Sequence, residues 1–362
     1  MPRPIAAVIH MGSLRHNLNR MREAAGNRTL WAVVKANAYG HGLLRAMHAF
    51  EAADGLAMID ICDAEMVRAY GWEKRILLLE GFFDETDLPV LQKLDIETIV
   101  HNREMIEMIR KNAPYESLKV HVKINSGMNR LGFLPEQEQA VFDELKAIEG
   151  VQVMGVVTHF ANAEPSYRAQ APVSVQKQLS RMGELANMQE GVCLSNSAAL
   201  LWHPQVQGDA VRAGVALYGV SPDASISSDS LGILPAMTLR SKILAIQTIN
   251  EGDAVGYGSR FVAKRPTRIA IVACGYADGY PRRMPDGAPT YVEGQIAPIA
   301  GAVAMDMLSI DVTDIAQAKV GSDVELWGKH VSINALAQLS GTIGYELMCA
   351  LTLRVPKLQD NN

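Results

Sequence analysis

The sequence predicts a (β/α)8 barrel followed by a mainly β domain, within the α/β fold class. Three observations support this prediction. The chain has 362 residues, which exceeds the length of one ordinary domain. Before a Ser- and Asp-rich stretch at residues 223–229, short apolar runs alternate with longer amphipathic stretches. After residue 237 helical periodicity is scarce and short runs separated by Gly and Asp turns replace it, as is typical of a β domain.

Eight short apolar runs are the predicted barrel strands. They cover residues 30–34, 56–59, 76–79, 97–101, 119–124, 153–158, 192–195 and 210–213. Helical patterns lie between them, around residues 43–53, 63–70, 86–93, 103–111, 136–148 and 173–188. We expect Asn102 to cap one of these helices and Pro135 to open another. Eight alternating strands and helices are typical of a closed barrel, and a doubly wound open sheet is the alternative because the runs at 56–59 and 192–195 are weak.

A ninth run at residues 5–10, before a predicted helix at 14–24, exceeds what the barrel needs, and we expect it to pair with the second domain. The predicted strands of that domain cover residues 239–249, 269–274, 296–299, 307–312 and 323–327, with one short helix near 333–339. The predicted division assigns residues 11–232 to the barrel. It assigns residues 233–362 to the C-terminal β domain, and we expect the first strand, within residues 1–10, to associate with that domain.

Composition indicates a globular protein with a sizeable core, since 48% of the residues are hydrophobic and 20% are charged. The net charge is −5 and the 34 basic residues form no long run, so we expect no nucleic-acid or anionic-membrane partner. No apolar stretch approaches 18 residues, and no signal peptide is evident, so we expect a cytoplasmic protein without a membrane span. The four cysteines lie far apart in the sequence, which predicts buried, reduced thiols and no metal site.

Polar residues recur where the predicted barrel strands end, which is where barrels place their chemistry. Lys35 ends the first strand, His159 follows the sixth, and Arg212 lies in the last. Lys35 stands between Val34 and Ala36, a poor position for a solvated charge. Desolvation lowers the pKa of an amine and favours Schiff-base chemistry, although most lysines are simply surface charges.

The last predicted strands offer a phosphate site. Ser197 supplies a hydroxyl, and Gly214 and Val215 supply backbone N–H groups at the position where barrels often bind phosphate. Ordinary interpretations stay open at this point. Gly214 would then simply occupy a turn, Arg212 would form an ion pair at the edge of the core, and His159 would be a core histidine with satisfied hydrogen bonds.

Nine segments together carry a closer likeness. They are AVVKANAYGHG (32–42), KINSGMNRLGF (123–133), THFANAE (158–164), SNSAA (195–199), RAGVALYG (212–219), GYGSRF (256–261), CGYADGYPRR (274–283), MDM (305–307) and GYELMCAL (344–351). In order and approximate spacing, this set resembles the alanine racemases over residues 5–356. The resemblance implies a pyridoxal 5′-phosphate (PLP) barrel followed by a β domain, and a homodimer that interconverts L-alanine and D-alanine.

The resemblance implies a two-base mechanism. Lys35 would hold PLP as a Schiff base, and its released amine would take the proton from D-alanine. Tyr257 of the second chain would take the proton from L-alanine on the opposite face. Racemisation needs a base on one face of the planar carbon and an acid on the other, and these two residues meet that need.

Further roles follow from the same resemblance. Arg212 would face the pyridine nitrogen, oriented by His159. Because a guanidinium does not readily give up a proton, the ring nitrogen would stay unprotonated, which would limit side reactions such as transamination. The residues that match phosphate-binding positions are Tyr39, Ser197, Gly214, Val215 and Tyr345, with Asn196 beside them.

Arg130 matches the arginine near the phenolic oxygen of the cofactor and the substrate carboxylate. Lys123 matches a lysine that is often carbamylated and positions that arginine, and an ordinary ion-paired lysine is the alternative. Met305 of the second chain matches the residue whose backbone N–H meets the substrate carboxylate. Tyr276 and Arg282 match positions at the entrance.

This sequence departs from the family at Ala302, where Arg is common, at Asn125, where Asp is common, and over residues 58–61. We expect these changes to affect local packing or dimer contacts. Two alternative activities also stay open: a broader-specificity racemase acting on serine or lysine, and a barrel-type amino-acid decarboxylase. Arg212 and Tyr257 argue against the decarboxylase, and the long β domain argues against a non-catalytic PLP-binding protein. The sequence does not distinguish a biosynthetic role from a catabolic one.

Overall fold

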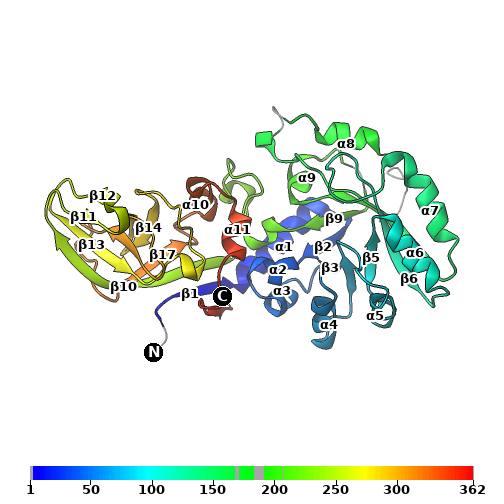
Figure 1. Ribbon diagram of the computed structural model, residues 1–362, viewed down its shortest axis with the longest axis horizontal. Coiled ribbons are helices and arrows are strands. Elements are labelled where there is room, and N and C mark those ends of the chain that lie inside the picture. The colour runs from blue at the N-terminus through cyan, green and yellow to red at the C-terminus, as the bar shows by residue number, and fades with distance from the viewer. Residues whose placement is uncertain (1–2, 168–170, 183–190, 207, 362) are drawn as a thin grey trace. The chain divides into compact units, whose positions relative to one another are not determined.

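The computed structural model describes residues 3–167, 171–182, 191–206 and 208–361 (Figure 1). They fall into two compact units: residues 18–38 and 42–217 in one, and residues 1–17, 39–41 and 218–362 in the other. The division passes through helix α1 (Met11–Ala25). Each unit is described by itself below.

The first unit is a closed barrel of eight parallel strands. They are β2 (Thr29–Val33), β3 (Gly55–Met58), β4 (Arg75–Leu78), β5 (Glu97–Val100), β6 (Leu118–Lys123), β7 (Val151–Val157), β8 (Val192–Ser195) and β9 (Ala210–Ala213). Strand β9 pairs with β2 and closes the ring, with Leu30 opposite Val211. The predicted barrel is thus confirmed and the open sheet is wrong. The two weak runs are strands because every residue of β3 and β8 is buried, as befits parallel strands covered on both faces.

Helices follow the strands around the barrel. They are α3 (Leu43–Ala49), α4 (Ile61–Ala69), α5 (Asp87–Lys93), α6 (Arg103–Lys111), α7 (Glu138–Lys146), α8 (Val175–Arg181) and α9 (Ser197–Trp202). Asn102 caps α6 as predicted, since its side chain accepts the N–H of Met105 at 2.9 Å. Pro135 opens the short turn η1 (Pro135–Gln137) that leads into α7. The predicted helix at 173–188 is α8, and residues 183–188 of that prediction lie outside the described residues.

The second unit is built on one eight-stranded sheet. Its strands are β1 (Ala6–His10), β10 (Met237–Ile249), β13 (Thr267–Val272), β14 (Pro289–Val292), β15 (Gln295–Pro298), β16 (Leu308–Asp311), β17 (Asp323–Trp327) and β18 (Lys357–Asp360). The long strand β10 is its centre, because it pairs with β1, β13 and β17. Helices α10 (Ile333–Ser340) and α11 (Gly344–Cys349) complete the unit.

A small hairpin, β11 (Ala254–Val255) and β12 (Phe261–Val262), projects from this unit. Val255 belongs to a hydrophobic cluster with Ile269 and Ala300, against which Phe261 packs. This cluster fixes the base of the hairpin. Its tip, the turn η6 (Tyr257–Ser259), carries Tyr257.

The cysteine prediction is partly wrong. Cys193 and Cys274 are buried free thiols as expected, but Cys62 and Cys349 are exposed. Cys62 lies in the first turn of α4, where Asp60 caps the helix next to solvent. Within the described residues, no helix is long and apolar enough to span a membrane.

Candidate active site

Lys35 lies where β2 ends and starts an unusual left-handed turn, α2 (Lys35–Tyr39). The four residues after Lys35 have φ between 50° and 54°, a conformation that costs an L-residue about 1–2 kcal/mol. Hydrogen bonds hold this backbone in place. The N–H of Ala38 donates to the carbonyl of Val34 at 2.8 Å, and the side chain of Asn37 accepts the N–H of Leu43 at 2.8 Å. Strain of this kind persists only where surrounding contacts determine the conformation, and it often marks functional sites.

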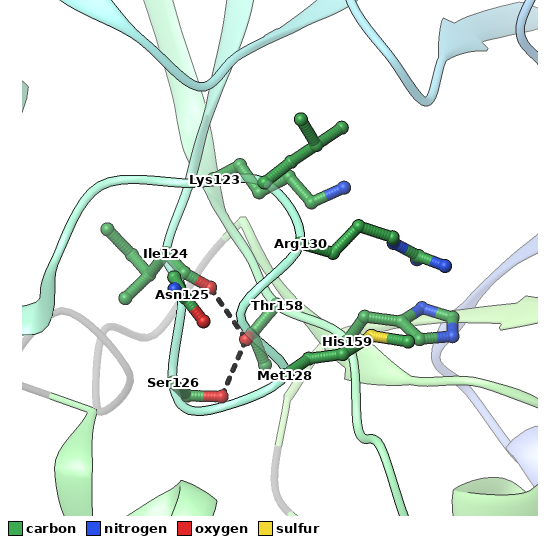
Figure 2. Close-up of a pocket in the computed structure, with 9 residues that line it drawn as sticks. Lys123, Ile124, Asn125, Ser126, Met128, Arg130, Thr158 and His159 are labelled. Atoms are coloured by element: carbon green, nitrogen blue, oxygen red, sulfur yellow. Dashed lines mark hydrogen bonds between the residues drawn. The ribbon is translucent and has the colours of Figure 1, made fainter.

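Basic side chains gather at the same end of the barrel. Lys123 is the last residue of β6 and is buried, Arg130 lies in the following loop, and His159 comes after β7. Figure 2 shows the three side chains extending toward the same side of a small hollow of about 10 Å³, room for about one water.

The pKa values of this cluster are shifted toward the neutral forms. Burial, helped by the charges of Arg212 and Arg130, lowers the pKa of Lys123 to about 8. Burial and the same two arginines hold the pKa of His159 well below 6.5. No described carboxylate forms a salt bridge with Lys123, which argues against the ordinary ion-paired lysine. The cluster therefore favours an anionic ligand.

Arg212, in β9, is held by neutral acceptors. One terminal nitrogen, Nη1, donates to the carbonyl oxygen of Cys193 at 2.6 Å and to its Sγ at 3.0 Å. The other, Nη2, donates to the carbonyl oxygen of Thr158 at 2.5 Å. These contacts show that backbone carbonyls of the neighbouring strand ends orient the guanidinium.

The expectation that His159 orients Arg212 is not supported. No hydrogen bond between their side chains is found among the described residues, and the charge of Arg212 lowers the pKa of His159 instead. The interpretation of Arg212 as one half of an ion pair fares no better, because no described acid forms a salt bridge with it.

Ser197 and Gly214 lie together where β8 and β9 end. Ser197 Oγ accepts the N–H of Gly214 at 2.8 Å, and Val215 follows in the buried turn η4 (Val215–Tyr218). Asn196 caps α9 by accepting the N–H of Ala199 at 2.9 Å. The side chain of Asn196 thus shapes the turn around Ser197.

In the other unit, Tyr39 lies in a group of aromatic rings. Its ring centre is 4.7 Å from that of Tyr218 and 6.1 Å from that of Tyr345. Burial raises the pKa of Tyr39, so its hydroxyl remains a hydrogen-bond donor. Gly40 has φ of 81°, and a Cβ there would meet the carbonyl oxygen of Met348 at 2.3 Å, so this close approach requires glycine.

Tyr276 and Met305 come from two paired loops of the β unit. The N–H of Tyr276 donates to the carbonyl of Ala304, and the N–H of Ala277 to that of Met305, both at 3.0 Å. Tyr257 is 77% exposed and Met305 is 52% exposed, and Arg282 is exposed as well. These residues lie on the surface of the single chain.

Several residues that hold this site were not predicted from the sequence. Cys193 and Thr158 anchor Arg212, and Tyr218 contacts Tyr39. Thr158 and Tyr218 lie inside quoted motifs, but their types gave no chemical signal. Gln178 could have been found from the sequence, because it is a polar residue three positions after Val175 and therefore lies on the buried face of α8. Asn125 shapes the loop before Arg130, because its Oδ1 accepts the N–H groups of Gly127 and Asn129. Its Nδ2 also donates to Asn129 Oδ1 at 3.2 Å, a bond that the common Asp could not donate.

Comparisons with known proteins agree with this geometry. Residues 9–222 match the family model described as alanine racemase, N-terminal domain, and residues 236–359 match alanine racemase, C-terminal domain. An alanine racemase of Janthinobacterium sp. (strain Marseille) is 46% identical over 100% of both chains. A catabolic alanine racemase of Klebsiella aerogenes is 45% identical, with 98% of this chain and 99% of that one covered. The biosynthetic alanine racemase of Pseudomonas aeruginosa superposes with a TM-score of 0.93 at 39% identity, over 99% of each chain.

Proposed function

The chain belongs to the alanine racemase family, and we propose that it interconverts L-alanine and D-alanine with PLP as its cofactor. The observation that carries this proposal is the position of Lys35, which stands at the end of a barrel strand near other cationic side chains. Lys35 lies close enough to Lys123 for their positive charges to oppose each other, and a lysine amine is the group that forms a Schiff base with an aldehyde.

The residues of the barrel fit this cofactor. The hydroxyl of Ser197 and the N–H of Val215 suit a phosphate group, and Gly214, whose N–H donates to Ser197 Oγ, lies beside them. Arg212 carries only N–H donors and suits the lone pair of a pyridine nitrogen. By resemblance to the family, Tyr39 and Tyr345 also match phosphate-binding positions, with Asn196 beside them, and we propose that they help to hold the phosphate here. When bound, PLP supplies an electron sink that makes the α-proton of the substrate acidic.

The side chains of the protein then have to accept, hold and donate the protons, and must not pass one to the cofactor ring. Lys35 would accept or donate the α-proton on one face, and Tyr257 on the other. Arg212 has neutral acceptors around it and no described acid beside it, so it would not pass a proton to the ring. Arg130 would bind the substrate carboxylate, and His159, held neutral, would line the same site.

The exposure of Tyr257 supports a homodimer. A second copy that covers Tyr257 and Met305 would remove them from water, and Tyr276 and Arg282 would then line the entrance. We therefore propose that residues 233–362 of one chain complete the site of the other. We also propose a cytoplasmic location, which cell fractionation would test.

The surroundings of Lys123 support its carbamylation. The neutral amine would attack carbon dioxide, form an N–C bond and release one proton, leaving a carbamate anion. Arg212, Arg130 and Lys35 would stabilise that anion, because all three oppose the positive charge of the amine. A carbon-13 NMR signal from labelled bicarbonate should appear in the wild type and be absent in Lys123→Ala. A signal retained in the variant would overturn the assignment.

Racemase assays test the activity directly. The wild type should convert either enantiomer of alanine to an equal mixture, and Lys35→Ala should lose both the activity and the visible absorbance of lysine-bound PLP. An inactive wild type with full cofactor occupancy would contradict the proposed function. Assays on serine and lysine would measure substrate breadth, and carbon dioxide release would reveal a decarboxylase.

Tyr257→Phe tests the assignment of faces. It should slow α-deuterium exchange from L-alanine more than from D-alanine, because the tyrosine acts on the proton of L-alanine. Equal losses from both enantiomers would argue against this assignment.

A further inference from the structure

A fully buried polar network lies behind the cationic cluster. Gln178 of α8 is 0% exposed, and Ser126 and Thr158 are each 1% exposed. Gln178 Nε2 lies 2.9 Å from Ser126 Oγ, which lies 2.8 Å from Thr158 Oγ1. Thr158 Oγ1 lies 2.8 Å from the carbonyl oxygen of Ile124 (Figure 2). The chain of bonds thus connects a helix, the loop after β6 and the end of β7.

Counting hydrogens fixes the direction of every bond. A hydroxyl has one hydrogen, and the carbonyl of Ile124 can only accept, so Thr158 donates to it. Ser126 must then donate to Thr158, and Gln178 must donate to Ser126. The second amide hydrogen of Gln178 goes to the carbonyl of His159 at 3.0 Å, and its Oε1 accepts the N–H of Ala161 at 2.8 Å.

The amide of Gln178 therefore has one workable orientation. Turning it over would place N–H against N–H at Ala161 and oxygen against oxygen at His159. Buried polar networks of this kind rigidify their surroundings when every member is satisfied. This one satisfies both hydroxyls and all three groups of the amide.

The network acts on main-chain atoms next to the site residues. The carbonyl of Thr158 accepts Nη2 of Arg212, and the next residue is His159. Ile124 follows Lys123, and Ser126 lies in the loop that leads to Arg130. One neutral network thus reaches the backbone beneath four of the cationic or titratable groups of the site.

We propose that Gln178, acting through Ser126 and Thr158, is a positioning residue for the racemase reaction. It sets the acceptor that holds Arg212 and the loop that presents Arg130. The inference rests on the proposed function, since these arginines matter only if they face cofactor and substrate. A misplacement of about 1 Å at such groups can cost about 10²-fold in rate.

Gln178→Glu tests the proposal with almost no change of shape. An ionised glutamate has no hydrogen to donate, so it would oppose both Ser126 Oγ and the carbonyl of His159. We expect kcat to fall by about 10- to 100-fold in both directions, with a much smaller change in KM for alanine. Gln152→Glu, the same substitution at an exposed position of β7, is the matched control and should keep wild-type kinetics.

A second pair keeps the test valid if Gln178→Glu does not fold. Thr158→Val removes the hydroxyl at nearly constant shape, and Thr158→Ser restores it. The dissociation constant of PLP, measured by titration of the apoprotein, should rise about tenfold in Thr158→Val and return to near wild type in Thr158→Ser.

The outcomes distinguish a failure of the proposed function from a failure of the positioning role. If the wild type does not racemise alanine, the proposed function is wrong. If the wild type is active and folded Gln178→Glu and Thr158→Val keep its kcat and its affinity for PLP, the positioning role is overturned. A lower unfolding temperature with unchanged kcat in these variants would also assign the network to stability alone.

Discussion

At the scale of single residues, charge burial decides how the barrel behaves. Lys123 and Glu97 lie on neighbouring strands, and each is nearly inaccessible to solvent, but their pKa values shift for opposite reasons. Lys123 has only cationic neighbours that oppose its charge, apart from Glu80. Glu97 has two cationic or titratable partners, Arg75 at 2.5 Å and His121 at 2.7 Å. The shift at Lys123 fits its proposed carbamylation, and the ion pairs of Glu97 stabilise the fold.

Lys123 should make the apoprotein more stable at higher pH. Its pKa is about 8 in the folded chain and 10.5 unfolded, so between these values only the unfolded chain holds the proton. The free energy of unfolding should therefore rise by about 3 kcal/mol as the pH increases through this window. Thermal unfolding in buffer free of carbon dioxide should show Lys123→Met more stable than the wild type at pH 7, with the difference shrinking toward pH 10. A difference that does not change with pH would contradict this account.

Glu97 should protect the barrel against acid. Burial alone would raise its pKa, but hydrogen bonds from His121 and Arg75 outweigh burial and lower the pKa to about 2. The stabilisation is present above the ordinary value of 4.5 and is lost as the pH falls toward 2. Glu97→Gln should cost about 3 kcal/mol at pH 7, because it leaves a buried partner unpaired. The loss should shrink below pH 4, and Glu107→Gln, at an exposed ion pair, should cost little.

At the scale of elements, the barrel was predictable because its strands are continuous apolar runs with polar residues at their ends. The β unit was predicted less completely. Strand β18 is polar (Lys357–Asp360), and it forms because its backbone pairs with β1, almost the whole chain away. Strand β14 begins with a proline and was also missed. Such strands depend on distant partners, which local periodicity does not show.

In the active site too, residues that stand out by their type and position could be predicted from the sequence, and contacts between distant segments could not. Lys35, Arg212 and Ser197 carry chemistry in their residue types and stand at strand ends, so the sequence could predict them as candidates. Cys193 contacts Arg212 only because β8 and β9 are neighbours in the barrel. The left-handed turn after Lys35 was not predicted, since its sequence, Ala36, Asn37 and Ala38, contains no glycine. Long-range contacts decide both features.

Gly40 offers a test at this scale. Gly40→Ala would place a Cβ 2.3 Å from the carbonyl oxygen of Met348 and strain a residue whose φ is 81°. The turn carrying Tyr39 should shift, and the unfolding temperature and the affinity for PLP should both fall. Gly26→Ala is the matched control. Its φ of 61° gives a similar backbone strain of about 1 kcal/mol, but nothing lies within 4 Å of the added Cβ. Equal effects of the two substitutions would show that the close approach does not matter.

At the scale of the whole molecule, the proposed chemistry needs two chains. Each chain carries Lys35 near a cationic cluster that includes the buried Lys123 and Arg212, and an exposed Tyr257. If the active site is shared, a chain lacking Lys35 can still supply Tyr257 to its partner. Two defects on different chains should then complement each other, as symmetric assemblies with composite sites allow.

Mixing two inactive variants tests most directly whether the active site is shared between two chains. Lys35→Ala and Tyr257→Phe would be combined in equal amounts under conditions where subunits exchange, and alanine racemisation would be followed with time. Random pairing gives half heterodimers, each with one intact site, so activity should recover to about a quarter of the wild type. Exchange without any recovery, confirmed by differently tagged chains, would contradict a site built from Lys35 of one chain and Tyr257 of the other.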